Sequence, residues 1–353
     1  MRRINNIKPF LFLLLTFLMF LPVSALAEKG HEGEEKLNVK EVVFEHLADA
    51  YDWHIYTLDG HHVSIPLLII VKGNSGWQTF SSSRLAHGES FNGFYIAEEG
   101  DYAGKIVEKN SAGEIVRPLD ISITKNVATL LINSVFVLLI ILPLARWYKR
   151  KSKAPPKGFL GFVEMLIVSI QEDVIKACIG EDYKRYSPYL LTAFFFILFS
   201  NMMGLIPFFP GGANLTGNIA ITFFLAFCTF LAVNLNTNKH YWKEIFWPDV
   251  PMFIKYPIAI MPLVEIIGVI SKPFALMVRL FANIMAGHSM VIGLICVIFI
   301  TSTMGAATNT SMSVVAVIFS IFINCIELLV AYIQAYVFTL LSAVFIGLAR
   351  AKH

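Results

Sequence analysis

Arg279 stands inside an apolar stretch, Ala275 to Ile300, that otherwise has the composition of a membrane helix. An arginine does not lose its proton in proteins, and placing one at bilayer depth costs from about 2.5 to over 10 kcal/mol. A cost of this size predicts a functional role and a partner that offsets it. The alternative is an arginine that snorkels to the headgroups from a helix end. We disfavour it because a long apolar run follows Arg279.

Two titratable residues flank Arg279 on the same segment. At a rise of about 1.5 Å per residue, Glu265 lies about 21 Å to one side and His288 about 13 Å to the other. At about 100° per residue, Glu265 falls about 40° off the face of Arg279, and His288 lies on roughly the opposite face. We therefore expect two half-paths for protons, separated by a fixed positive charge. The alternative for Glu265 is an interfacial carboxylate without a transport role.

The last apolar segment, Val314 to Leu348, carries matching polar residues. If the two segments form an antiparallel hairpin that turns near residue 306, residues whose numbers sum to about 614 lie at similar depth. This arithmetic pairs Arg279 with Gln334 and His288 with Glu327. The alternative for the second pair is a purely structural hydrogen bond.

The helical period also groups residues by face. One stripe of the final helix consists of Asn324, Glu327, Ala331, Gln334 and Phe338. A stripe of the preceding helix consists of Ala275, Arg279, Ala282, Asn283 and Ala286. Small residues around an arginine allow another helix to approach closely.

Composition places these segments in a polytopic membrane protein. The chain has 353 residues, of which 56% are apolar and only 15% charged. We expect an all-α polytopic membrane protein with five membrane crossings, at about residues 127–146, 188–207, 217–236, 257–303 and 312–349. Basic residues follow the first, third and fifth crossings, which puts those ends in the cytoplasm and the mature N-terminus outside.

The last two crossings are too long to stand upright. The 47 residues of 257–303 would reach roughly 70 Å as one helix, against a hydrocarbon core of about 30 Å. We expect two long, tilted, antiparallel helices, or a break near Pro262 or Pro273. Residues 158–179 are too polar to span, and they predict an amphipathic helix on the membrane surface.

The N-terminal part differs from the rest. Basic residues, a short apolar run from Pro9 to Pro22 and a final Ala25-Leu26-Ala27 predict a cleaved signal peptide over residues 1–27. An uncleaved first helix is the alternative. Residues 28–120 hold 16 of the 25 acidic but only 8 of the 28 basic residues, which predicts an exported acidic soluble module.

Short alternating runs predict a small β-rich fold for this module: Trp53 to Leu58, His62 to Val71, Trp77 to Ser82, Phe91 to Ile96 and Gly104 to Glu108. Its histidines lack a metal-ligand spacing, so we expect no metal site. The four cysteines all lie outside it, in membrane or membrane-surface segments: Cys178, Cys228, Cys296 and Cys325. No disulfide framework is indicated.

At this point the residues resemble a known family. The run Arg279-Leu-Phe-Ala-Asn-Ile-Met-Ala-Gly-His288 is similar to the signature of the a subunit of the F-type ATP synthase membrane sector (FO). Further segments of the resemblance are Ser271-Lys272-Pro273, Asn201-Met-Met-Gly-Leu-Ile-Pro207, Asn214-Leu-Thr-Gly-Asn218, and Glu327 with Gln334. It covers about residues 120 to 350, and the leader and enlarged N-terminal module depart from shorter members.

The resemblance implies a stator proton channel beside a rotating ring of c subunits, with peripheral-stalk b subunits as further partners. Protons would pass Asn218, His288 and Glu327, with Asn324 beside them, to a c-ring carboxylate, and would leave past Glu265. Arg279 would hold that carboxylate ionised, and Gln334 and Asn283 would orient the guanidinium. For this chain the resemblance implies a multi-pass location in a bacterial plasma (inner) membrane, without a cofactor and without catalytic chemistry of its own.

Other functions fit less well. A Na⁺-translocating version of the same subunit stays open, because the c-ring largely sets the ion. A secondary transporter would usually have internal repeats, which the hydropathy lacks. An intramembrane hydrolase would need a Gly-x-Ser-x-Gly or His-Glu-x-x-His motif, and neither occurs. The chain also has no phosphate-binding loop, so we expect it to bind neither nucleotide nor nucleic acid, only lipid and partner subunits.

Overall fold

The computed structural model describes residues 49–58, 61–74, 76–97, 100, 102–109, 114–150, 155–206, 215–235, 237, 239–246 and 260–350. The predicted leader, the first part of the acidic module, Asn214 and the loop 207–214 lie outside these residues. The chain divides into two units, which we describe separately. Among the described residues, one unit contains 56–63 and 287–326, and the other contains 49–55, 64–286 and 327–350.

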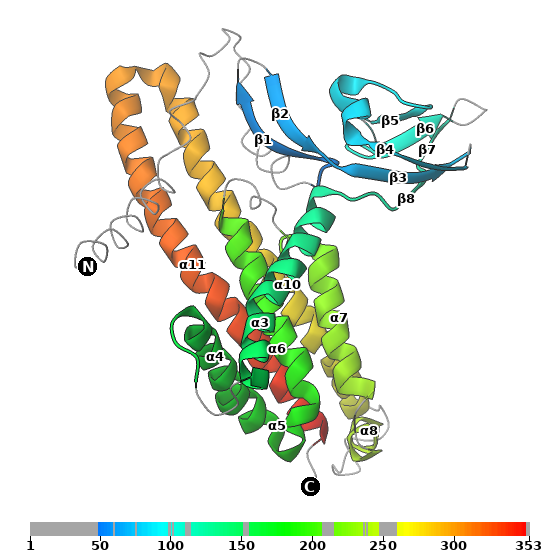
Figure 1. Cartoon of the computed structure of the whole chain (residues 1–353), viewed down its shortest axis with the longest axis vertical. Coiled ribbons are helices and arrows are strands. Elements are labelled where there is room, and N and C mark those ends of the chain that lie inside the picture. The colour runs from blue at the N-terminus through cyan, green and yellow to red at the C-terminus, as the bar shows by residue number, and fades with distance from the viewer. Residues whose placement is uncertain are drawn as a thin grey trace. The chain divides into compact units, whose positions relative to one another are not determined.

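The N-terminal part forms strands (Figure 1). Their bounds are β1 Asp52–Leu58, β2 His61–Pro66, β3 Leu68–Gly73, β4 Gly76–Ser81, β5 Phe94–Ile96, β6 Ile106–Lys109, β7 Ile115–Val116 and β8 Leu119–Asp120, with a 3₁₀ helix η2 at Ser82–Gly88. They pair as β1-β2, β4-β3-β8 and β5-β6-β7. Alternation along β3 buries Ile69 and Val71 and leaves Leu68 and Lys72 exposed, as expected for a sheet with one covered face.

A small apolar core joins the two three-stranded sheets. It contains Tyr51, Ile69, Val71, Phe80, Leu85, Phe94 and Ile106. The Tyr51 hydroxyl donates a hydrogen bond to Asp120 at 2.5 Å, which holds β8 against the core. Burial raises the pKa of Tyr51, and its hydrogen bond to Asp120 raises it further.

Helices make up the remainder of the described chain. They begin with α3 (Lys125–Arg150), α4 (Phe159–Ser169), a π-helical turn η3 (Ile170–Lys176), α5 (Ala177–Ile179), η4 (Gly180–Asp182) and α6 (Tyr183–Leu205). They continue with α7 (Ile219–Leu235), α8 (Lys239–Phe246), α10 (Ile260–Thr301), η5 (Ser302–Met304) and α11 (Ala306–Arg350). Gly180, at a φ of 77°, ends α5, and the chain reverses direction there before α6 (Figure 1).

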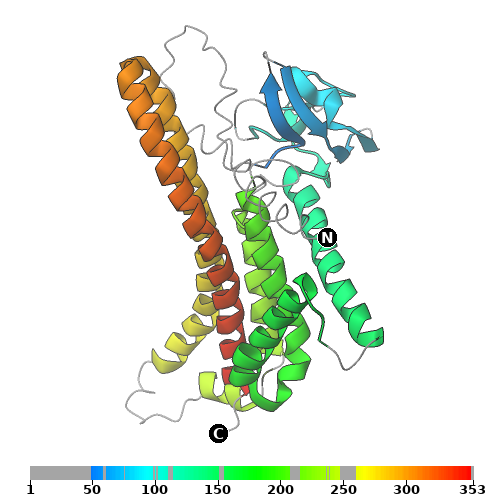
Figure 2. The ribbon, with the colours of Figure 1, turned by 60° about the vertical axis from the view of Figure 1, so that its left-hand side comes forward.

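The predicted long hairpin is present. Helices α10 and α11 run side by side in both ribbon views, joined through η5 and Gly305, which has a φ of 101° (Figures 1 and 2). At 42 and 45 residues they would measure roughly 63 and 68 Å along their axes. Pro273 lies inside α10 without ending it, so the helix assignment continues through the predicted break.

Four helical stretches within the described residues are long and apolar enough to cross a membrane: Lys125–Arg150, Phe159–Leu205, Leu263–Met304 and Ala306–Arg350. The second includes the segment that we predicted on the membrane surface. Ile219–Leu235 is apolar but has 17 residues, about 26 Å of helix. The chain is therefore a mostly helical, multi-pass membrane protein, and the fifth crossing stays a prediction.

The C-terminal end of α11 is fixed against the turn between α5 and α6. Arg350 forms an ion pair with Asp182 and donates a hydrogen bond to the Tyr186 hydroxyl at 2.9 Å. One turn earlier, Gly347 allows a close backbone approach. A Cβ atom at Gly347 would lie 2.1 Å from the carbonyl oxygen of Cys178.

We expect Gly347→Ala to destabilise the chain, because α11 would have to move away from Cys178 or deform. Overpacking of this kind costs about 1–3 kcal/mol. The midpoint of thermal unfolding of the purified protein in detergent should fall. Gly268→Ala is the matched control, since its Cβ would meet nothing within 4 Å, and its midpoint should stay the same or rise. Equal midpoints for both variants would contradict the packing described here.

Candidate functional site

Helix α10 has two chemically different faces around its arginine. Its buried face carries Leu276, Met277, Leu280 and Ile284, each at most 6% exposed. Its exposed face carries Ala275, Arg279, Ala282 and Ala286. The helical period therefore grouped Arg279 with three exposed alanines correctly. Asn283, the fifth member of the predicted stripe, is half-buried and faces α11.

Arg279 is exposed on this face, which we call the small-residue face: Ala275, Arg279, Ala282 and Ala286. Within the described part of the chain, no hydrogen bond or ion pair holds its guanidinium. Large apolar side chains are also exposed on neighbouring turns of α10, for example Phe274 at 61% and Ile270 at 63%. The charge thus lies on a helix whose surroundings are otherwise apolar, and the small neighbours leave its approach open.

The partner of Gln334 differs from the predicted one. The Asn283 side-chain amide donates a hydrogen bond to the Gln334 carbonyl oxygen at 3.3 Å, whereas depth arithmetic had paired Gln334 with Arg279. Lys272, which lies over the Phe345 ring at 5.7 Å, supports the same register. In that register Arg279 lies level with about Phe338. Phe338 is about one turn farther from the hairpin loop than Gln334, the residue that the arithmetic had paired with Arg279. The depth arithmetic failed because it placed the centre of the turn near residue 306. It also assumed that the two antiparallel helices pair without a shift along their axes.

The predicted stripe of α11 is largely buried. Glu327 is 6% exposed, Ala331 1%, Gln334 5% and Phe338 2%, and Asn324 is half-buried. The Oε1 atom of Glu327 has no hydrogen-bond partner among the described residues. A buried carboxyl oxygen without a partner is costly, so this atom is suited to bind a proton or a water molecule.

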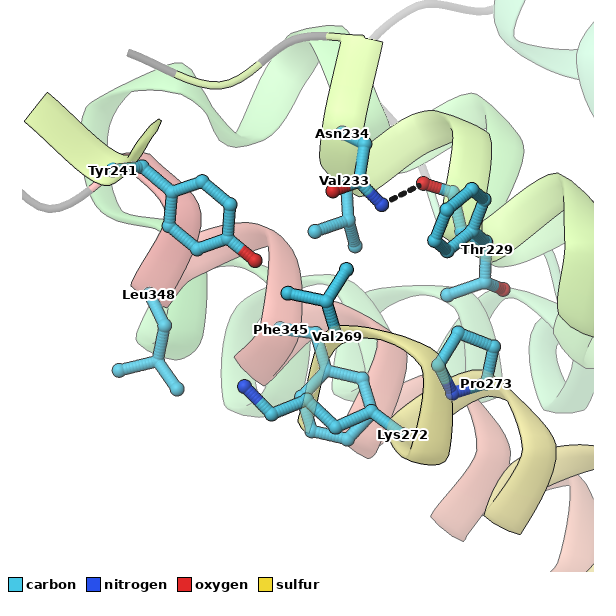
Figure 3. A pocket seen from close by; sticks show the side chains of 10 residues that line it. Thr229, Val233, Asn234, Tyr241, Val269, Lys272, Pro273, Phe345 and Leu348 are labelled. Carbon is cyan, nitrogen blue, oxygen red and sulfur yellow. Dashed lines mark hydrogen bonds between the residues drawn. The ribbon is translucent and has the colours of Figure 1, made fainter. Parts of the chain in front are cut away.

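Glu265 lies at the other end of α10, near a narrow cleft. It is half-buried, and its charge acts on Tyr241 of α8. Burial raises the pKa of the Tyr241 phenol, and the negative charge of Glu265 raises it further. Figure 3 shows the cleft, to which Tyr241, Asn234, Lys272 and Pro273 contribute.

This cleft is small, and its mostly apolar lining includes a few polar side chains. The space open to the centre of a water molecule is about 20 Å³, enough for one or two waters. Asn234 contributes a buried Oδ1 atom that has no partner within the described residues, while its amide donates to the Phe230 carbonyl at 2.8 Å. The cleft can therefore hydrate the end of the hairpin that carries Glu265.

His288 and Glu327 fall in different units of the chain. Their predicted pairing is therefore not tested by the geometry and stays a prediction. Asn218 has a defined local role. Its Oδ1 atom accepts a hydrogen bond from the Ala220 backbone at 2.9 Å, so it caps the N-terminus of α7.

Sequence reasoning missed a buried polar connection between α6, the segment that precedes α7, and α11. Thr216 donates a hydrogen bond to Asn201 Oδ1 at 2.7 Å, and the Asn201 amide donates to the Ala331 carbonyl at 3.5 Å. Both side chains are at most 2% exposed. Asn201 and Thr216 both lie in motifs quoted above, but only the tertiary fold brings those motifs together.

A second polar connection joins α6, α7 and α11 lower down. The Tyr189 hydroxyl lies 2.8 Å from Thr229 Oγ1, which lies 3.3 Å from Ser342 Oγ. A further bond joins α3 to α6, since the Asn133 amide donates a hydrogen bond to Ser200 Oγ at 2.7 Å.

No group of three or more potential metal ligands occurs in the described parts of the chain.

These features define a class of protein: a multi-pass membrane protein with a charged residue exposed on an apolar helix. The family described as "ATP synthase A chain" matches residues 128–347, and the chain belongs to this family. It is thus an ion-translocating component of the FO sector and not a catalytic subunit. A second family, described as "Domain of unknown function (DUF8433)", matches residues 42–125.

Relatives include proteins with the name "ATP synthase subunit a". One from Chlorobium phaeobacteroides is 39% identical over 304 residues, which cover 83% of this chain and 85% of that protein. One from Chloroherpeton thalassium is 43% identical over 241 residues, 66% of this chain and 68% of that protein. One from an Anaeromyxobacter species is 34% identical over 344 residues, 94% of this chain and 74% of that protein.

Thr216→Val should destabilise the helical part, because it leaves the buried Asn201 Oδ1 without its donor. An unsatisfied buried acceptor costs about 1–3 kcal/mol. We expect a lower midpoint of thermal unfolding in detergent. Thr222→Val is the matched control: Thr222 is also fully buried, but its hydroxyl bonds only to carbonyls of its own helix turn, at 3.1 and 3.4 Å. A control that loses as much stability as Thr216→Val would contradict this role.

Proposed function

We propose that the chain is the stator proton channel of an F-type ATP synthase and forms two offset half-paths that load and unload a carboxylate on a ring of c subunits. The observation that carries the proposal is the exposure of Arg279 on the small-residue face of α10. A permanent charge on a membrane helix needs an anionic partner. A c-ring carboxylate that approaches over alanines supplies one.

The guanidinium then has two tasks. An opposite charge within a few ångströms lowers a carboxylate pKa by about 1 to 3 units, so Arg279 keeps the arriving rotor carboxylate ionised and drives release of its proton. The same fixed positive charge repels protons, which blocks direct leakage from one half-path to the other. The hydrogen bond between Asn283 and Gln334 holds α10 against α11 next to this charge.

The half-paths are assigned by the titratable residues on either side of Arg279. Glu327, with His288, Asn324 and Asn218, belongs to the path from the outer side. The unpartnered Oε1 of buried Glu327 supports a proton-accepting role. Glu265 belongs to the cytoplasmic path, and the adjacent cleft, with room for water, supports that assignment.

We further propose an orientation and a set of partners. The basic residues in the last turns of α3 and α11, Lys149, Arg150 and the final Arg350, favour a cytoplasmic location for these ends. The mature N-terminus, with residues 28–120 as an exported module after a cleaved leader, then lies outside a bacterial plasma membrane. The c-ring faces Arg279, and peripheral-stalk b subunits contact the chain elsewhere.

Arg279→Ala should reduce ATP-driven proton pumping in membrane vesicles by roughly a hundredfold or more, since it removes a preorganised charge from the transfer site. Assembly should be unaffected, because Arg279 bonds to no other described residue. Arg279→Lys should also fail, since a compact ammonium lacks the planar fork of a guanidinium. Lys149→Ala, which removes an exposed cation in the last turn of α3 and outside the proposed half-paths, is the control and should retain most pumping. Near-normal pumping by an assembled Arg279→Ala complex would refute the assignment.

His288 and Glu327 should behave as a coupled pair. Each single alanine variant should slow proton transport, and the exchange His288→Glu with Glu327→His should recover more activity than either of its single changes. A double-mutant cycle on transport rates should give a coupling free energy of about 0.5–3 kcal/mol. Additive losses would mean that the two residues act independently, while the role of Arg279 would be unaffected.

A further inference from the structure

The β4-β3-β8 sheet has one face that no described part of the chain covers. Lys72 pairs with Trp77 of β4 and with Leu119 of β8, and Ile70 pairs with Thr79. Paired residues point to the same side of a sheet. Ile69, Val71 and Phe80 point to the opposite side, into the core. We call the uncovered side the outer sheet face: Leu68, Ile70, Lys72, Trp77, Thr79, Leu119 and Ile121.

The outer sheet face is unusually apolar for an exposed surface. Leu68 is 43% exposed, Trp77 55%, Leu119 57% and Ile121 58%. They form one patch, because Trp77 and Leu119 both neighbour Lys72 across the strands. A continuous exposed apolar patch of this kind marks a protein or membrane contact site.

The charge on this face indicates which of these contacts it makes. Lys72 is the one charged residue among the seven, although residues 28–120 hold 16 acidic and 8 basic residues. Its Nζ atom lies 5.8 Å from the centre of the Trp77 ring. Tryptophan is enriched at membrane interfaces, and lysine covers apolar surface with its stem while its ammonium reaches the phosphates. An apolar patch with a single cation matches a phospholipid headgroup layer.

The sheet is also fastened to a membrane helix. The backbone after β8 continues to pair with β3, since Ile121 N–H donates to Ile70 at 3.0 Å and Ile123 N–H donates to Leu68 at 2.9 Å. The chain then enters α3, whose first residue, Lys125, donates its N–H to the Ala50 carbonyl at 2.9 Å. These bonds leave no flexible linker between the sheet and the start of α3.

Helix α3 also has an exposed apolar side. Residues at helical spacing along it are exposed: Val127 at 41%, Leu131 at 51%, Val135 at 55% and Leu138 at 54%. This stripe is the lipid-contacting side expected of a membrane helix. Two strand spacings separate Trp77 from Leu119, about 10 Å, so the whole outer sheet face is within reach of the interface at which α3 enters the bilayer.

We propose that the outer sheet face rests on the phospholipid headgroup layer beside the start of α3, with Trp77, Leu119 and Ile121 at the acyl boundary. The sheet then acts as a surface anchor that fixes the depth and tilt of α3. The proposal uses no residue of the proton path and stands independently of the proposed function.

Fluorescence quenching in lipid vesicles tests this anchor. The full chain is reconstituted into phosphatidylcholine vesicles with or without bromine near the glycerol end of the acyl chains. Because the chain has five tryptophans, the Trp77 signal is obtained by subtracting the fluorescence of the Trp77→Phe chain from that of the native chain. We expect bromine to remove roughly half or more of this signal, as for an interfacial tryptophan. The control introduces a tryptophan elsewhere, as Tyr102→Trp in the Trp77→Phe chain. Tyr102 is 39% exposed, and it lies between β5 and β6, outside the outer sheet face. The fluorescence of the added tryptophan should persist in the brominated vesicles.

Two results would overturn the proposal. A Trp77 signal that iodide quenches in vesicles and bromolipid does not would place the face in water. A signal that neither agent quenches would mean that protein, not lipid, covers the face.

A second measurement does not depend on Trp77. A spin label at Thr79→Cys, in a chain whose native cysteines are replaced, should be more accessible to oxygen than to a water-soluble nickel complex. A label at Thr79→Cys that is more accessible to the nickel complex than to oxygen, as expected of the same label at the water-exposed Tyr102→Cys, would also overturn the proposal.

Discussion

A positive charge without an ion pair among the described residues is the constraint on which our account of the helical structure depends. Arg279 lies on an apolar helix, and its isolation in lipid would cost about 2.5 kcal/mol or more. We therefore propose that an anion from a partner subunit neutralises it. The small residues at Ala275, Ala282 and Ala286 follow from the same constraint, because a bulky neighbour would hold the anion at a distance.

A helix that presents a charge must itself be held in place by its other side. Leu276, Leu280 and Ile284 do this by packing, and the Asn283 bond to Gln334 adds a directional contact. Behind α11, Asn201 and Thr229 connect α6, α7 and α11 through buried hydrogen bonds. Each such bond in a membrane contributes only about 0.6 kcal/mol on average, so their main effect is to fix which faces meet. Glu327 is the exception, because one oxygen of its buried carboxyl has no hydrogen-bond partner among the described residues, and we propose it as a transfer site for protons.

The local periodicity of the sequence was sufficient to predict much of this. The grouping of Arg279 with small residues and of Glu327 with Phe338 follows from 100° per residue, and the hairpin turn was placed within a few residues of Gly305. Which of these stripes is exposed and which is buried became clear only from the structure. Contacts between helices were harder. Depth arithmetic was wrong by about one turn at Gln334, because an offset between helices leaves no mark on either sequence. The approach of Gly347 to Cys178 and the pairing of Thr216 with Asn201 depend on tertiary packing alone.

The central claim is that the small-residue face of α10 meets the rotor. Disulfide cross-linking tests it most directly, in an assembled complex whose native cysteines in this chain are replaced. A cysteine at Ala282 is compared with one at Phe274, which is also exposed but lies about 140° around the helix from Arg279. Each is paired with a cysteine one turn from the c-subunit carboxylate. We expect a cross-link from Ala282→Cys that stops ATP-driven rotation until a reductant is added, and none from Phe274→Cys. A cross-link from Phe274→Cys alone would show that another face of α10 meets the ring, and Arg279 would then not face the rotor.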